Sequence, residues 1–382
     1  MRKTLTTLAL TVVALLGLGI VLLATASAVR AQGLYADPHF FVRRQLMWLG
    51  VSFVVVFAAT RFDYHWWKET PALSVGFYLM VVTALLLVFV PVIGSKVKGS
   101  YRWLNLGPLR MQPSEFAKVL TVVAMSVWMD RIGRCVRQFW KGAVFPAFGL
   151  VVIAGLLVME PDFGATMVVC VAGGALMFVA GTRIIYLLFF GVAGVSVVGA
   201  FVLANANRME RITAWLHGEE SGSSAAYQLK QALLAFENGG PWGVGFNQSI
   251  QKYNYLPEAH TDFIYAIGGE EFGFIFSISV IAAYVVILVC GMLISLRAPD
   301  RLGRFLAFGM TLLLVFQAAF NIGVVTGCLP TKGLALPFMS YGGTNLVTAM
   351  LAIGTLMNIG RHVDVFDERL HTQVVKNATI KL

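Results

Sequence analysis

The sequence predicts an all-α polytopic membrane protein, from its composition and from the pattern of its apolar segments. Of its 382 residues, 58% are hydrophobic and only 13% are charged, and the mean hydropathy is +0.77. A soluble globular protein would carry roughly twice that charged fraction. Apolar runs of about 17 to 25 residues recur along the chain, and each can cross the hydrocarbon core of a bilayer as a helix.

These runs predict about ten transmembrane helices within a single domain, residues 1–382. The expected spans are residues 5–27, 45–60, 72–93, 115–129, 143–159, 164–181, 184–204, 263–295, 303–328 and 343–360. A large loop, residues 205–262, separates the seventh and eighth spans and is expected to be a folded extracytoplasmic element. It contains an amphipathic segment, AAYQLKQALLAFENGG, that Gly239 and Gly240 would end. Residues 361–382 form a polar tail, expected in the cytoplasm.

Three further features narrow the class of protein. The N-terminal segment resembles a signal peptide, but its apolar run exceeds the usual length of about 7 to 15 residues, so we expect a retained first helix. The four cysteines include no C-x-x-C pair, which implies neither a disulfide framework nor a zinc site. The net charge of +10 is expected to come from basic loops beside the membrane and not from nucleic-acid binding.

The distribution of basic residues predicts the orientation of the chain. An even number of spans places both termini on one side, which they share with the Arg-rich loops 130–142 and 296–303. Short basic loops stay in the cytoplasm, so both termini are expected there. Loop 94–114 runs against this trend, because it is expected outside and carries Lys96, Lys98, Arg102 and Arg110. Either short-loop statistics vary by chance, or this cluster binds an anion such as a diphosphate or a lipid headgroup.

The segment QPSEFAK, residues 112–118, places two charges at the start of the fourth span. Pro113 and Ser114 suit the first turn of a helix. Glu115 and Lys118 stand three residues apart and therefore share one helix face. Ionisable residues within membrane spans usually face the bundle interior and mark functional sites. The alternative is a structural ion pair that holds helices together.

Two more acids, Glu160 and Asp162, occur in the tight outer turn MEPDFGAT, residues 159–166. Pro161 and Gly164 explain a turn without any function. The two carboxylates could therefore be solvated, or they could belong to a site on the outer face.

The segment YLPEAHTDFIYA, residues 255–266, combines Glu258, His260 and Asp262 just before an apolar run. Asp262 or Thr261 could cap the following helix. Alternatively, Asp262 is a carboxylate at the edge of a low-dielectric site and takes up a proton during catalysis. Two further acids, at positions 270 and 271, follow within the span. A cap needs no such neighbours, so we favour a functional role.

The outer segment TGCLPTKGLALPFMSYGGTN, residues 326–345, is rich in Gly, Pro, Ser and Thr and contains one cation, Lys332. Irregular backbone at membrane depth occurs only where it is buried in protein or lines a cavity. The sequence therefore predicts a re-entrant loop that closes an outward-facing pocket, with Lys332 and Ser340 as candidate substrate contacts.

Four segments in this order resemble the SEDS family of peptidoglycan glycosyltransferases, over nearly the whole chain. They are GSYRWLNLGPLRMQPSEFAK, EPDFGAT, YLPEAHTDFIYAIGGEEFG and LPTKGLALPFMSYGGTN. The context of the third segment, with SIQK before it, is more similar to the cell-division branch than to the elongation branch of the family. One departure, GVGFNQS at residues 243–249 in place of a Gly-Leu-Gly run, affects only the expected local shape of the loop.

The resemblance implies polymerisation of lipid II into glycan strands at the outer face of the cytoplasmic membrane. It assigns the essential aspartate of the family to Asp262, with Arg102, Glu115 and Lys118 as polar residues of the site, and leaves Glu258 and His260 as neighbours. Joining an α-linked diphosphate donor through a β-1,4 bond is a single inversion, which needs one base and stabilisation of the leaving group. The remaining candidate contacts to the diphosphate are basic, namely Arg110, Lys96 and Lys98.

The resemblance also bears on cofactors and partners. No cofactor is required, although a divalent cation, Mg²⁺ or Mn²⁺, could assist at the diphosphate. The expected partners are a class B penicillin-binding transpeptidase, other divisome proteins and membrane lipids, with the division septum as the site of action. Three rival interpretations are a lipid II flippase, a non-catalytic scaffold and an elongation polymerase. The ionisable residues gather near the outer leaflet, which favours surface chemistry over transport through the membrane.

Overall fold

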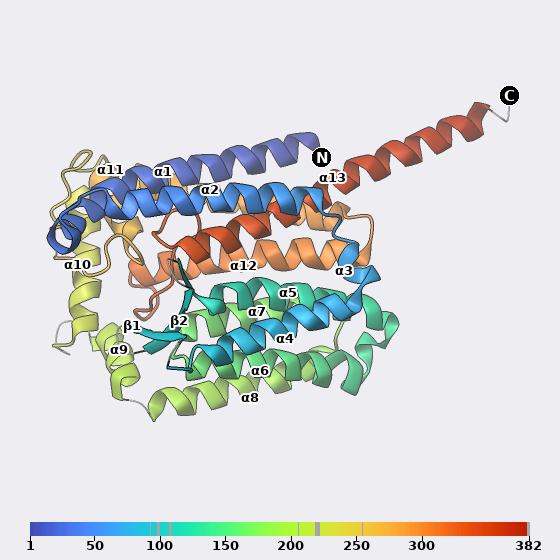
Figure 1. The fold of residues 1–382 in the computed structure, drawn as a ribbon, viewed down its shortest axis with the longest axis horizontal. Helices are drawn as coiled ribbons and strands as arrows, with labels where there is room; N and C mark the ends of the chain where they lie inside the picture. The colour runs from blue at the N-terminus through green and yellow to red at the C-terminus, as the bar shows by residue number, and fades with distance from the viewer. Residues whose placement is uncertain are drawn as a thin grey trace.

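The computed structural model is a bundle of long helices that run roughly parallel to one another (Figure 1). The structure describes residues 1–91, 93–97, 100–106, 109–204, 206–217, 222–253 and 255–379. The first half of the chain contains α1 (Arg2–Tyr35), α2 (Phe40–Arg61), α3 (Trp66–Glu69), α4 (Pro71–Leu87), α5 (Pro113–Ile132), a 3₁₀ turn η1 (Gly133–Arg137), a π-helical turn η2 (Phe139–Val144) and α6 (Phe145–Met159). The second half contains α7 (Phe163–Ala180), α8 (Ile184–Leu203), α9 (Ala206–His217), α10 (Ser224–Gly239), α11 (Ile264–Arg297), α12 (Arg301–Val325) and α13 (Gly343–Thr379).

The fold confirms the predicted class, a polytopic helical membrane protein. Within the described residues, eight helices are long and apolar enough to cross a membrane. They are α1, α2, the continuous η2–α6 segment, α7, α8, α11, α12 and the first part of α13. The two other predicted spans are α4, whose apolar part is shorter, and α5, which carries the Glu115–Lys118 pair. Every predicted span is therefore occupied by a helix.

The bundle has two ends with different character (Figure 1). At one end, here called the terminal end, the amino group of Met1 lies 3.2 Å from Asp364 Oδ1 on α13, so the chain begins where its last span finishes. α3 and the connection between α11 and α12 lie at this end. The opposite end, here called the loop end, carries α9, α10 and the strands. An even number of spans accounts for this arrangement.

The core is formed by α1, α5, α11, α12 and α13, whose inward residues are almost completely excluded from solvent. α1 belongs to this core through Leu8, Leu15 and Leu22, as expected for a retained helix. α8 is the opposite case, because none of its residues is buried. An apolar helix with no buried face needs lipid or another protein around it.

The structure differs from prediction in loop 94–114, for which no strands were expected. Strands β1 (Gly94–Val97), β2 (Ser100–Leu106) and β3 (Leu109–Met111) form an antiparallel sheet in the order β1-β2-β3. β2 reads SYRWLNL, and its aromatic residues favour a half-buried pleated strand. The sheet leads directly into α5, with Gln112 as the N-cap residue.

The segment between α12 and α13, which the sequence predicts as a re-entrant loop and which keeps that name here, is buried in the protein. Leu336, Met339 and Ser340 are at most 2% exposed although no helix or strand contains them. The backbone of this loop is satisfied by side chains of the bundle, since Gln317 donates to the Ala335 carbonyl and Tyr284 donates to the Pro337 carbonyl. Such partners make irregular backbone tolerable at this depth.

The described part of the large loop, residues 206–217, 222–253 and 255–262, is folded, and two glutamates of α11 hold it in place. The carboxylate of Glu270 accepts hydrogen bonds from the Ser249 hydroxyl and from the backbone amides of Ile250 and Gln251. Glu271 forms an ion pair of 3.4 Å with Lys252, and both side chains are at most 2% exposed. We call Glu270 and Glu271 the anchor pair. α10 ends at Gly239 with Gly240 as its C-cap, as predicted.

Candidate active site

Asp262 lies at the loop end, in the turn that leads into α11. The interpretation of Asp262 or Thr261 as a helix cap is wrong, because α11 begins at Ile264 with Phe263 in the N-cap position. Thr261 instead donates its hydroxyl to Glu258. The half-buried Asp262 carboxylate is therefore placed by tertiary contacts and not by the end of its helix.

The re-entrant loop supplies these contacts. A Cβ added to Gly333 would lie 2.8 Å from Asp262 Oδ2, so only a glycine lets the carboxylate rest against this loop. Asn321 on α12 donates to the backbone carbonyls of both Asp262 (2.8 Å) and Leu334. These contacts fix the turn that holds Asp262 against the loop that carries Lys332.

Three arginines lie around Lys332, and we call the four basic side chains the cation cluster: Arg102, Arg208, Arg211 and Lys332. Burial lowers the pKa of Lys332 to about 7; the carboxylate of Asp162 opposes this shift, and the three arginines add to it. The ammonium of Lys332 lies 3.9 Å from the ring centre of Phe163, and the guanidinium of Arg208 lies 4.3 Å from the same ring. Both cations thus lie against the same aromatic ring.

Two arginines of the cluster, one on a strand and one on a helix, donate to backbone carbonyls. Arg102 on β2 donates to the backbone carbonyls of Glu160 (2.9 Å) and Pro161 (2.6 Å). Arg211 on α9 donates to the Thr331 carbonyl in the re-entrant loop, at 3.3 Å. These hydrogen bonds go to neutral carbonyls, so they orient the guanidinium groups without neutralising their charge.

Two acids of the turn between α6 and α7 complete the surroundings of the cluster. Asp162 caps α7 by accepting from the Ala165 amide, and it also accepts from Gln112 and Ser114. Glu160 is fully buried, and neither of its carboxylate oxygens has a hydrogen-bond partner among the described residues. Burial, with a smaller contribution from the charge of Asp162, raises the pKa of Glu160 to about 9. Glu160 is therefore protonated at neutral pH and does not offset the positive charge.

Lys118 and Glu115 lie outside the cation cluster. The Lys118 ammonium is 1% exposed and donates to Glu115 (2.9 Å) and to Gln317 Oε1 (2.6 Å). Gln317 in turn donates to the Ala335 carbonyl of the re-entrant loop and to Asn345. In this structure the pair connects α5 to α12 and to the loop that positions Asp262, which is the ion-pair alternative raised by the sequence.

The other candidate residues have diverse surroundings. Glu258 pairs with Arg30 on α1 at 3.1 Å, and the ring of His260 packs 4.7 Å from that of Phe41. Ser340 is buried and accepts from the Leu336 amide, so it shapes the re-entrant loop. Arg110 is exposed on β3. The Lys96 backbone lies in β1, and Lys98 falls outside the described residues.

Among the residues of the loop end that the structure describes, no group of three His, Cys, Asp or Glu side chains could hold a divalent cation. Of the side chains described, the group of three His, Cys, Asp or Glu residues that could hold a metal is Asp63, His65 and His362, and none of these belongs to the cation cluster. Asp162 already accepts three hydrogen bonds. We therefore derive no chemical step through a protein-bound metal at this site.

Comparisons with known proteins identify the family of the chain. The profile of a family described as cell cycle protein, which covers FtsW, RodA and SpoVE, matches residues 6–365. The chain belongs to the FtsW/RodA/SpoVE family. The resemblance found in the four sequence segments is thereby confirmed.

Individual members of the FtsW/RodA/SpoVE family are similar to this chain over nearly their whole length. The chain is 40% identical over 354 residues to the probable peptidoglycan glycosyltransferase FtsW of Trichlorobacter lovleyi, covering 92% of each chain. It is 38% identical to stage V sporulation protein E of Bacillus subtilis, covering 91% of this chain and 94% of that one.

Two solved structures share the fold. A chain of a peptidoglycan synthase complex that coordinates polymerization and crosslinking superposes with a TM-score of 0.76 at 25% identity, covering 93% of this chain and 97% of the other. RodA of Thermus thermophilus superposes with a TM-score of 0.67 at 26% identity, covering 93% and 95%.

Sequence reasoning did not identify Arg208 and Arg211. Both lie on α9, in a loop expected outside the membrane, where basic residues run against the usual topology. The argument that singles out the basic residues of loop 94–114 applies equally to residues 205–262 and indicates both arginines.

Proposed function

We propose that this protein is a peptidoglycan glycosyltransferase that polymerises lipid II by an inverting reaction at its loop end. The observation that carries the proposal is the position of Asp262 against the loop of Lys332, with a cation cluster whose charges are not balanced by nearby carboxylates. The Asp262 carboxylate can accept a proton, and the cation cluster can hold an anion. The names of the relatives support the substrate class.

The reaction assigns a distinct task to each part of the site. The 4-hydroxyl of the acceptor GlcNAc loses its proton to the Asp262 carboxylate as its oxygen attacks the anomeric carbon of the donor MurNAc. The bond from that carbon to the lipid diphosphate breaks, and its electron pair leaves with the diphosphate oxygen. Attack from the face opposite the leaving group converts the α linkage into a β-1,4 bond, without a covalent enzyme intermediate.

The cation cluster stabilises the charge that develops on the departing diphosphate. Arg102, Arg211 and Lys332 approach from a strand, a helix and a loop, so the pattern of positive charge is fixed before the substrate arrives. Guanidinium groups bind phosphate oxygens through paired N–H donors. Mg²⁺ or Mn²⁺ carried by the diphosphate itself would add to this charge but would need no protein cage.

We extend the proposal to location and partners on the same basis. The protein would lie in the cytoplasmic membrane with both termini in the cytoplasm, so that the loop end faces outward. A class B penicillin-binding transpeptidase would cross-link the new strands, as suggested by the similarity to a chain of a complex that couples polymerization and crosslinking. The most similar relatives include many FtsW proteins, which favours a role with other divisome proteins at the septum.

The test is polymerisation of lipid II by the purified protein in liposomes, with and without the class B partner. Wild type should make glycan polymer, and Asp262→Asn should lower turnover by about 10²- to 10⁴-fold, the usual contribution of a general base. Glu237→Gln, which changes an exposed carboxylate of α10, should polymerise like wild type.

Four outcomes would contradict parts of the proposal. Absence of polymer from wild type with its partner present would leave the scaffold interpretation. Translocation of labelled lipid II across the liposome bilayer without polymer would favour the flippase. Normal polymerisation by Asp262→Asn would remove Asp262 as the base while leaving the reaction class in place. Complementation of an elongation strain, but not of a division strain, would reassign the role to cell elongation.

A further inference from the structure

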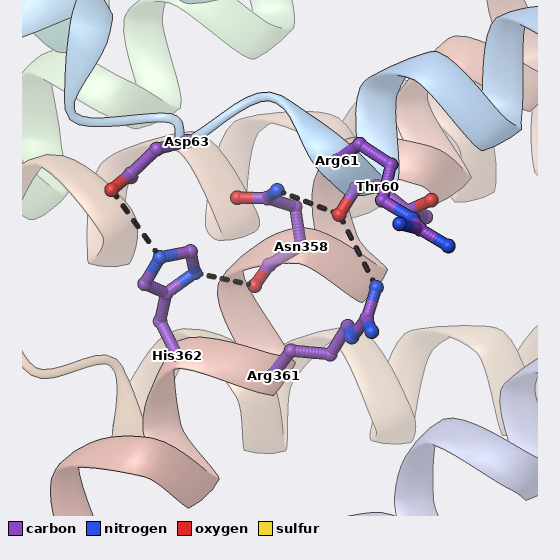
Figure 2. Close-up of a pocket in the computed structure, with 6 residues that line it drawn as sticks. All are labelled: Thr60, Arg61, Asp63, Asn358, Arg361 and His362. Atoms are coloured by element: carbon purple, nitrogen blue, oxygen red, sulfur yellow. Dashed lines mark hydrogen bonds and ion pairs between the residues drawn. The ribbon is translucent and has the colours of Figure 1, made fainter.

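The terminal end of the bundle contains a cluster of metal-ligating side chains that the proposed reaction does not use. Two of them, Asp63 and His65, lie in the turn between α2 and α3, and the third, His362, lies on α13. Asp63 and His362 border a pocket of about 280 Å³ that is lined by Thr60, Arg61, Asp63, Asn358, Arg361 and His362. Figure 2 shows Asp63 and His362 facing each other across this pocket.

The two oxygens of Asp63 each face a different imidazole. Asp63 Oδ1 lies 2.6 Å from His65 Nδ1, and Asp63 Oδ2 lies 3.4 Å from His362 Nε2. One ligand atom from each of the three residues lies within 4.8 Å of the others. Donor atoms about 2.0–2.1 Å from a tetrahedral zinc ion are separated by about 3.3 Å, so small rotamer adjustments would bring these three into range.

The remote nitrogen of His362 faces a hydrogen-bond acceptor, and that of His65 lies near a carboxylate at a distance beyond a hydrogen bond. His362 Nδ1 lies 3.0 Å from the backbone carbonyl of Asn358, one turn earlier on α13. His65 Nε2 lies 3.8 Å from Asp300 Oδ1, at the start of α12. An acceptor on the far nitrogen holds the proton there and leaves the near nitrogen free to bind a metal, the arrangement common around zinc-binding histidines.

Asp300 itself is well fixed. It is the N-cap residue of α12, where it accepts from the Gly303 amide, and it also accepts from the Tyr64 hydroxyl. Its carboxylate therefore cannot rotate freely toward the pocket, which suits an orienting acceptor better than a direct ligand.

We propose that Asp63, His65 and His362 bind one divalent transition-metal ion, with Zn²⁺ as the preferred ion. Two imidazole nitrogens and one carboxylate oxygen form a mixed donor set that suits zinc and is unsuited to Mg²⁺, which requires oxygen ligands. Water would occupy the remaining position. The ion would fasten the end of the α13 span to the α2–α3 turn, at the end of the molecule opposite the site of polymerisation.

The two arginines of the pocket do not occupy the ligand positions. The guanidinium of Arg61 lies 4.8 Å from the ring centre of Phe57, and Arg361 donates to the Thr60 carbonyl at 3.3 Å. Figure 2 shows Arg361 directed toward Thr60 and away from Asp63. Both guanidinium groups can therefore contact an anion that replaces the water on the metal.

The experiment measures metal binding to the full chain, purified in detergent through an affinity tag without histidine and stripped with a chelator. Equilibrium dialysis against Zn²⁺ should give one ion per chain for wild type. His362→Gln and His65→Gln should each weaken the affinity by more than the roughly 10–100-fold typical of changes behind the ligands. Asp300→Asn, which preserves a good N-cap, should weaken it by about tenfold.

A control and a second readout separate metal binding from folding. His39→Gln changes an exposed histidine outside the cluster and should bind Zn²⁺ like wild type. Zn²⁺ should raise the thermal midpoint of wild type and of His39→Gln, but not that of His362→Gln, because only binding to the folded state stabilises it. Co²⁺ in place of Zn²⁺ should give a visible absorption spectrum typical of four-coordinate nitrogen and oxygen ligands.

The proposal fails if wild type binds no more Zn²⁺ than the His65→Gln/His362→Gln double variant, or if Mg²⁺ competes with Zn²⁺ on equal terms. In the first case the cluster would be a set of His–Asp ion pairs. Neither readout depends on lipid II, so failure here leaves the proposed glycosyltransferase activity untouched.

Discussion

Two groups of acidic and basic side chains lie near the loop end, and they differ in how their charges are satisfied. The anchor pair is balanced within the protein, since Glu270 accepts from the Ser249 hydroxyl and from backbone amides, and Glu271 pairs with Lys252. The cation cluster keeps an excess of positive charge, because Arg102 and Arg211 donate to carbonyls and Glu160 is protonated at neutral pH. The carboxylate of Asp162 offsets only part of that charge.

The difference indicates what each group does. Buried charges are expensive unless they are paired, and a fully paired set has no remaining capacity for a ligand. The anchor pair therefore explains the shape of the outer loop and nothing more. An excess of positive charge beside a carboxylate, in contrast, leaves capacity for an anionic ligand, which is what the proposed function requires. Substitutions that disturb the functional group should consequently change turnover, whereas substitutions in the anchor pair should change stability.

The largest effect is expected at the contact between Asp262 and the re-entrant loop. Gly333→Ala would place a methyl group 2.8 Å from Asp262 Oδ2 and displace the carboxylate. A displacement of about 1 Å from the reactive geometry can cost about 100-fold in rate, so turnover in the lipid II assay should fall by that order. In Gly342→Ala, on the same loop, the new methyl would meet only Asn345 at 3.5 Å, and turnover should be unchanged. Equal rates for both variants would show that Asp262 does not depend on this loop.

A smaller effect is expected from the titration of Lys332. Its pKa of about 7 in the free protein means that the cationic form is lost as the pH rises above 7. If that form binds the diphosphate, kcat/KM should fall about tenfold per pH unit above pH 7. A bound diphosphate favours the charged form, so the corresponding fall in kcat should lie at higher pH.

Lys332→Arg provides the matched comparison. An arginine stays charged across this range, so the alkaline fall in kcat/KM should move beyond pH 9 while the rate at pH 6.5 changes little. An unchanged alkaline limb in Lys332→Arg would assign the titration to another group and remove Lys332 from the diphosphate site.

Much of the fold was predictable from the sequence. Spans are predictable because an apolar run must be helical in lipid, so length and hydropathy alone define them. The re-entrant loop was predictable for a related reason, because Gly- and Pro-rich backbone between two spans has to be buried in protein. The sheet of β1, β2 and β3 was not, since β1 and β3 are short and their pairing with β2 is not visible in a single sequence.

The site was only partly predictable. Asp262 and Lys332 stood out as charges beside apolar segments, but nothing local in the sequence shows that Gly333 lies against Asp262 or that Arg211 reaches Thr331. Lys118 illustrates the opposite case. Its position in a span indicated a functional charge, and the structure places it in a buried network with Glu115 and Gln317. Long-range contacts decide between these alternatives, and a single sequence does not contain them.

The smallest effect on turnover is expected in the anchor pair, where stability should change instead. Lys252→Met leaves Glu271 buried without its cation, which typically costs about 3–5 kcal/mol. The thermal midpoint should fall, while the folded fraction should polymerise lipid II within about twofold of wild type, since the pair has no part in the reaction. The double variant Lys252→Met/Glu271→Gln removes both charges and should recover most of the lost stability, a coupling that a double-mutant cycle measures directly. A large loss of turnover in the double variant at restored stability would mean that the large loop also takes part in the reaction. The anchor pair could then no longer be assigned to structure alone.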